Sequence, residues 1–153
     1  MMITSHRDKI ARLNSLRARL DPLEDFELWF WSTMTAGTNA VNAALHHAGL
    51  TKEESAFPSQ PGVYSVATGD SGNAFRSELR ALGDVLHVGR PPVPGTIPPD
   101  IAEMMTVMEI IEHYRDPCTR GDMAIDRQTV SACDKAYLRC AALLETRLGG
   151  ARA

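Results

Sequence analysis

The sequence predicts an all-α protein, a bundle of four to five helices with an irregular loop excursion at about residues 51–72. Three observations lead to this prediction. Apolar residues recur every three or four positions over five helix-length stretches, which is the period of an amphipathic helix. Proline and glycine separate these stretches. The length of 153 residues is close to the commonest size of one domain, so residues 1–153 are expected to form a single helical domain.

The first predicted helix spans about residues 5–20, where Ile10, Leu13 and Leu16 recur at helical spacing among charged residues. This pattern is typical of an amphipathic surface helix. Pro22 follows the expected end, and proline cannot continue a helix because it has no amide hydrogen to donate.

The second predicted helix, from Leu23 to Ala48, is the longest candidate without interruption, and Gly49 supplies a typical C-terminal stop. No formal charge occurs over the 23 residues from Leu28 to Leu50, although 23% of the whole chain is charged. A membrane span is not expected, since the serine, threonine, asparagine and histidine side chains make this stretch too polar for lipid.

One face of this helix is polar but uncharged, and we expect another surface to cover it. The residues expected to face a partner or ligand are Trp31, Thr35, Asn39, Asn42 and His46. A homodimer is the leading interpretation, because an interface core loses Lys and Glu but retains neutral hydrogen-bonding groups. Burial within the monomer and a ligand pocket are the alternatives.

Residues 51–72 contain two prolines and three glycines around a short run, Val63–Val66, that is compatible with one strand or with an ordered loop. A third helix is predicted over about 75–87, because four apolar residues there step by four, three and four positions.

Two more helices are predicted in the C-terminal half. The fourth opens at Pro98-Pro99-Asp100, carries a stripe of methionine and isoleucine, and closes at Asp116-Pro117. The last carries a narrow apolar seam from Val130 to Leu148, with Asp126 as a plausible N-terminal cap and Gly149 at its end.

The composition restricts the function classes. Sixteen basic and nineteen acidic residues give a net charge of −3, so no strong general attraction to nucleic acid or anionic lipid is expected. Three cysteines lack the spacing of a zinc site and are expected to be free thiols. The N-terminal residues lack the apolar core of a signal peptide, and a cytoplasmic, bacterial-type location is expected.

No metal site and no cofactor are predicted from residues close in sequence. Glu109, Glu112 and His113 do not converge on one face of their helix. His46 and His47 are adjacent, so their side chains diverge by about 100° on a helix and are poorly placed to share one ion. Motifs for phosphate binding and for a nucleophilic serine are absent from the sequence.

The layout resembles the HEPN superfamily of small bacterial helical bundles, whose members often dimerise. The residues that carry the resemblance are the alanine-rich run Thr38–Leu45 before Gly49, the run Glu112–Arg115 that closes a later helix, and Tyr137 in the last helix. Ribonuclease members carry an arginine, four to six intervening residues and then a histidine, which Arg80 and His87 match.

Two functions follow as expectations. The first is a non-catalytic helical bundle that acts through dimerisation and through binding of a protein or a small molecule. The second, implied by the resemblance, is a metal-independent ribonuclease that uses Arg80 and His87 and binds nucleic acid. Ala81 follows Arg80 where the ribonuclease members usually carry a polar residue, and this favours the first function.

Overall fold

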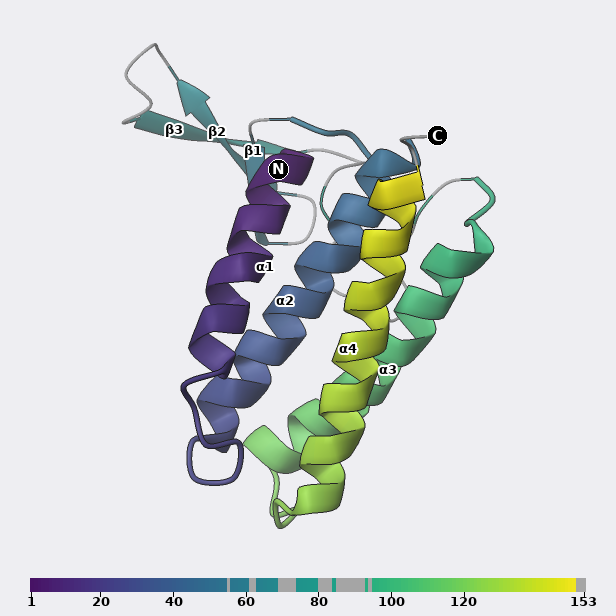
Figure 1. Ribbon diagram of the computed structural model, residues 1–153. Helices are drawn as coiled ribbons and strands as arrows, with labels where there is room; N and C mark the ends of the chain where they lie inside the picture. The colour runs from purple at the N-terminus through teal and green to yellow at the C-terminus, as the bar shows by residue number, and fades with distance from the viewer. Residues whose placement is uncertain are drawn as a thin grey trace.

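The computed structural model describes residues 1–54, 56–60, 63–68, 74–79, 84, 93 and 95–150. Within these residues the chain forms a bundle of four α-helices (Figure 1), which confirms the predicted all-α class. The helices are α1 (Ile3–Arg17), α2 (Phe26–His47), α3 (Pro99–Thr119) and α4 (Arg127–Gly149). In the described part of the chain, every helix is too short or too polar to span a lipid bilayer.

Helix α2 is the centre of the bundle. α1, α3 and α4 each pack against it, and α3 also packs against α4 (Figure 1). The residues at the middle of the core are Phe30, Val41, Leu45, Ile101, Met104, Met108, Ile111, Cys133 and Tyr137. Because neighbours cover α2 on several sides, an unpaired charge on it would be buried at a cost of several kcal/mol. This position accounts for the absence of charged residues in α2 from Leu28 onward.

The C-terminal end of α2 is a tight turn that brings the next residues back onto the helix. Gly49 has φ of 70°, a left-handed conformation that glycine adopts without strain. The amide of Gly49 donates to the carbonyl of His46, and the amide of Leu50 donates to the carbonyl of Leu45. These two bonds form the Schellman motif and place Thr51 beside the last turn of α2.

The caps of α3 and α4 follow local sequence signals. Pro99 is the first residue of α3, where its missing amide hydrogen costs nothing. α3 continues through Pro117 to Thr119, slightly beyond the predicted end. The side chain of Asp126 accepts a hydrogen bond from the amide of Thr129 at 2.8 Å, which confirms the predicted cap of α4.

The excursion after α2 leaves the bundle, and its described segments contain a small antiparallel sheet in the order β1-β2-β3 (Figure 1). The strands are β1 (Ala56–Gln60), β2 (Val63–Thr68) and β3 (Ala74–Leu79). The Val63–Val66 run therefore lies in a strand. The helix predicted over 75–87 is wrong at β3, because this segment pairs with β2 along its whole length. A short apolar run fits either period, and strand pairing decides between them.

The crossing of α2 and α3 leaves no room for a side chain at Gly37. A Cβ atom there would collide with Sδ of Met108, which is itself fully buried. Gly37→Val should lower the free energy of unfolding by about 1–3 kcal/mol, because overpacking forces the core apart. Chemical denaturation measures this. Gly149→Val is the control, since a Cβ at Gly149 meets nothing within 4 Å, and equal losses in the two variants would contradict the prediction.

Candidate functional site

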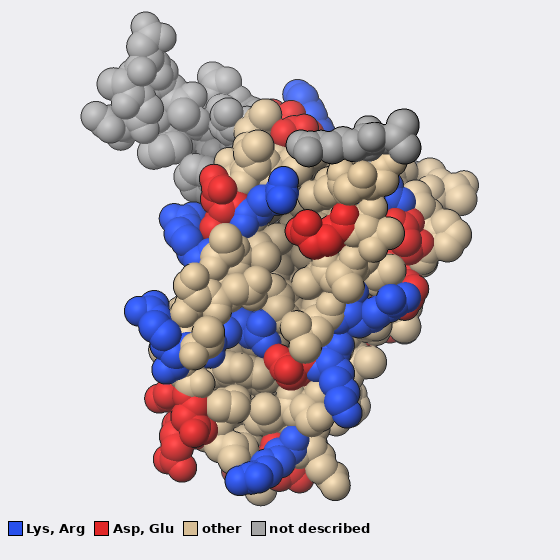
Figure 2. Space-filling model, viewed as in Figure 1, with Lys and Arg blue, Asp and Glu red and all other residues tan. Residues whose placement is uncertain are grey.

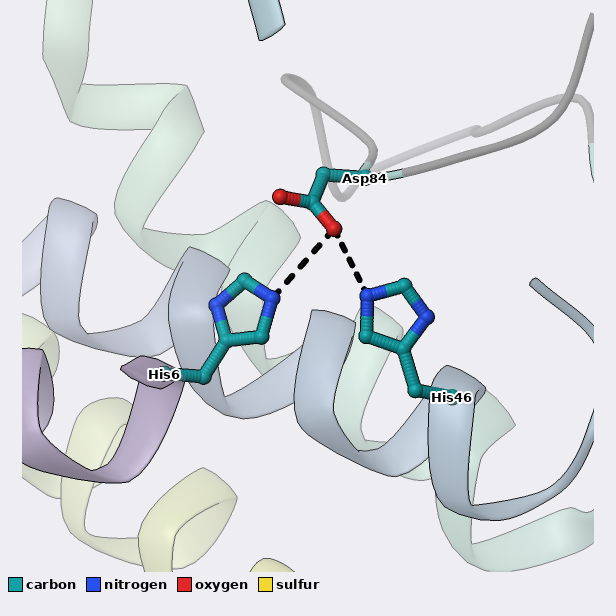
Figure 3. Close-up of side chains that lie close together, drawn as sticks. All are labelled: His6, His46 and Asp84. Atoms are coloured by element: carbon teal, nitrogen blue, oxygen red, sulfur yellow. Dashed lines mark hydrogen bonds and ion pairs between the residues drawn. The ribbon is translucent and has the colours of Figure 1, made fainter. Parts of the chain in front are cut away.

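Three side chains far apart in the sequence meet in the interior of the protein (Figure 3). His6 comes from the first turn of α1, His46 from the last turn of α2, and Asp84 from the segment after β3. One donor atom of each residue lies within 4.8 Å of the other two. The residues are 1%, 6% and 6% exposed, so the cluster is shielded from water.

The ring of His6 is held at both nitrogens. Nε2 lies 3.3 Å from Oδ1 of Asp84, and Nδ1 lies 2.8 Å from Oδ1 of Asn39. Asn39 in turn donates from Nδ2 to the backbone carbonyl of Thr35 at 2.7 Å. Asn39 and His46 are seven residues apart on α2 and therefore share the helix face on which His6 packs.

The ring of His46 is held in a similar way. Nε2 lies 2.6 Å from the same oxygen of Asp84, and Nδ1 lies 2.7 Å from Oγ1 of Thr51. The turn at Gly49 places Thr51 there. The two imidazole rings have their centroids 5.3 Å apart and both direct Nε2 toward Asp84 (Figure 3).

Asp84 is the common acceptor of the cluster. Burial by itself raises the pKa of the Asp84 carboxyl, because an apolar environment disfavours the charged form. Contacts with His46, His6 and the Met1 ammonium outweigh burial and lower the pKa of Asp84 below its ordinary range. The ammonium nitrogen lies 2.7 Å from Oδ1. Asp84 is therefore a carboxylate at neutral pH.

Two imidazole nitrogens and one carboxylate form a donor set that suits zinc and ferrous iron. At metal–donor bonds of about 2.0–2.1 Å, tetrahedral donors lie roughly 3.4 Å apart. The distance of 3.3 Å between His6 Nε2 and Asp84 Oδ1 agrees with this value. The distance of 2.6 Å between His46 Nε2 and Asp84 Oδ1 would have to open by less than about 1 Å.

The residues predicted to face a partner or ligand lie at different depths. Asn39, Asn42 and His46 are buried inside the single chain, and Trp31 and Thr35 are half-buried. α1 packs on this face of α2, so its missing charges are explained without a second copy. Homodimerisation stays a prediction.

Of the other candidate residues, some lie outside the described part of the chain and some are exposed on α3. Arg80 and His87 lie outside the described residues, so their predicted ribonuclease role stays a prediction. Glu109 and His113 are exposed on α3. Among the residues that the structure describes, His6, His46 and Asp84 form the one group placed to hold a metal ion. Figure 2 shows basic and acidic side chains interspersed over α1 and α4, with no extended basic surface on the described part of that face.

His46 was predicted from the sequence as a residue that faces a partner or ligand, whereas His6 and Asp84 were not predicted. His6 precedes Ile10 and Leu13 by four and seven positions, so it lies on the same face of α1 as these apolar residues. This spacing could have predicted that His6 is buried. Asp84 had no such signal, because it lies in a segment predicted as a helix surface and is 38 residues from His46.

Comparison with protein-family models, curated proteins and solved structures gives no match for this chain. The resemblance to the HEPN superfamily therefore stays a prediction.

Proposed function

We propose that this protein binds one divalent transition-metal ion, with Zn²⁺ as the reference ion, through His6, His46 and Asp84. The observation that carries the proposal is the convergence of three donor atoms of the right chemical types, from three separate parts of the chain, within 4.8 Å. Two neutral imidazoles and one carboxylate favour zinc and ferrous iron over magnesium or calcium, which prefer oxygen donors.

Three protein donors leave at least one coordination position for a water molecule or a small ligand. The small-molecule binding expected from the sequence would then take place at this open coordination position. A bound ion would also tie α1 to α2 and to the segment that carries Asp84. Binding to the folded chain alone raises the free energy of unfolding, by about 2.7 kcal/mol at a free metal concentration 100 times the Kd.

The experiment is a metal titration of protein stripped with a chelator. We expect one equivalent of Zn²⁺ to bind near neutral pH, one equivalent of Co²⁺ to give visible absorption bands, and the melting temperature to rise with either ion. His6→Ala and His46→Ala each remove a metal donor. Each variant should lose more metal affinity than the roughly 10- to 100-fold lost when only a hydrogen-bond partner of a donor is removed.

His47→Ala is the matched control, because His47 is the exposed neighbour of His46 on the same helix end. It should bind the metal like the wild type. Circular dichroism verifies that each variant is folded, and Asp84→Asn tests the third donor with little change of shape. Failure of the folded wild-type protein to bind either ion would refute the proposal, as would an unchanged affinity in His46→Ala.

A further inference from the structure

We propose that Asn39 is a positioning residue that fixes the tautomer of His6, while Thr51 allows His46 to change tautomer when an ion binds. This inference rests on the proposed metal site and specifies how the chain prepares it. Neither Asn39 nor Thr51 lies among the three metal donors. Each contacts the Nδ1 atom of one donor ring, on the side away from Asp84.

The side-chain amide of Asn39 has only one orientation that satisfies both of its contacts. The carbonyl of Thr35 can only accept, so the Asn39 atom that faces it at 2.7 Å is the NH₂ group. The other amide atom, 2.8 Å from Nδ1 of His6, is then the carbonyl oxygen, which also only accepts. Nδ1 of His6 must therefore carry the hydrogen and donate it to Asn39.

This assignment determines what the other nitrogen of His6 offers. A neutral imidazole carries one hydrogen, so Nε2 has a bare lone pair. That lone pair faces Oδ1 of Asp84 at 3.3 Å, and a carboxylate oxygen is also an acceptor. Two acceptors that face each other repel unless a cation lies between them. The geometry therefore presents the Nε2 lone pair of His6 and the carboxylate of Asp84 to the same place, where a metal ion would satisfy both.

His46 is not restricted in this way, because its Nδ1 faces a hydroxyl group. Oγ1 of Thr51, at 2.7 Å, can donate to a bare Nδ1 or accept from a protonated one. Without metal, Nε2 of His46 donates to Asp84 at 2.6 Å and Nδ1 accepts from Thr51. With metal on Nε2, the hydrogen belongs on Nδ1 and the hydroxyl turns to accept it.

The test reads the protonation of each ring nitrogen directly. Nitrogen-15 spectra of the histidine rings are recorded on the folded full chain, first without metal and then with one equivalent of Zn²⁺. We expect Nδ1 of His6 to be protonated in both states. His46 should change from an Nε2-protonated to an Nδ1-protonated ring when zinc binds.

Substitutions separate positioning from general packing. Asn39→Leu removes the acceptor at nearly constant volume and should weaken zinc binding about 10- to 100-fold. It should also release the His6 tautomer. Thr51→Val should weaken binding to a similar degree, and Thr51→Ser, which keeps the hydroxyl, should restore it. Thr38→Val is the control, because the Thr38 hydroxyl bonds to the carbonyl of Met34 on the same helix, away from the cluster.

The outcomes distinguish this inference from the proposed function. Failure of the wild type to bind zinc overturns the metal site and the tautomer change of His46, while the metal-free spectrum still decides whether Asn39 fixes His6. If the wild type binds zinc but Nδ1 of His6 is unprotonated, the role of Asn39 is overturned. Wild-type affinity in Asn39→Leu overturns it as well.

Discussion

Asp84→Ala is expected to lower the free energy of unfolding by about 3–5 kcal/mol, the cost of removing one member of a buried charged cluster. The carboxylate is the common acceptor for His6, His46 and the Met1 ammonium, and its side chain is 2% exposed. Without it, these groups lose the carboxylate that all three contact and that compensates the charge of the ammonium.

Chemical denaturation of metal-free protein measures this loss. Asp122→Ala is the control, because Asp122 is exposed between α3 and α4, and its loss should stay within about 0.5 kcal/mol. Asp84→Asn keeps the shape of the side chain and should fall between the two variants. A cost for Asp84→Ala as small as that of Asp122→Ala would contradict the prediction.

The same carboxylate gives the stability a definite pH dependence. The pKa of Asp84 is lowered in the folded state, whereas an unfolded aspartate has a pKa of about 3.9. Its contribution is therefore complete above that value and is lost as the pH falls toward the folded pKa. The free energy of unfolding should decrease more steeply on acidification in the wild type than in Asp84→Asn. Parallel pH curves for the two proteins would contradict this.

Arg17→Met is expected to lower the free energy of unfolding by about 2–4 kcal/mol. Arg17, whose side chain is 10% exposed, connects α1 to both of the helices beside it. Its guanidinium donates to Oγ1 of Thr33 on α2 at 2.8 Å and to Oδ1 of Asp134 on α4 at 2.6 Å. It also lies over the rings of Tyr137, at 4.3 Å, and Trp29, at 5.5 Å.

Methionine keeps most of the apolar stem but none of these polar and cation–π contacts. Arg17→Lys keeps the charge without the planar fork and should recover part of the loss. Arg12→Met, at an exposed position of α1, is the control and should change the stability by less than about 0.5 kcal/mol. Thermal and denaturant unfolding of the four proteins provide the comparison. If Arg17→Met and Arg12→Met unfold alike, the predicted connection does not stabilise the bundle.

Helix ends were predictable where the signal is local. Gly49 stops α2 and Asp126 caps α4, because each acts on backbone groups only a few residues away. Pro117 was expected to end α3, yet the helix continues to Thr119. A proline in the last turn removes one hydrogen bond but leaves the carbonyls before it free to accept from later residues or water.

The region from residue 51 to residue 87 was harder to predict. Its apolar spacing favoured a helix from residue 75, whereas Ala74–Leu79 forms β3. The deciding interaction is the pairing of β3 with β2, which joins backbone groups of two segments. The spacing of apolar residues within one segment does not reveal such a pairing.

The sequence by itself determined the four helices and their central member. Helical periodicity, proline, glycine and the charge-free span of α2 each act through neighbours along the chain, so they can be recognised without the fold. Only the tertiary structure decided what covers the polar face of α2 and that His6, His46 and Asp84 meet. His6 and Asp84 are 78 residues apart. Their contact depends on how α1 packs on α2 and on the position of Asp84 after β3. The spacing of residues within one segment predicts neither of these.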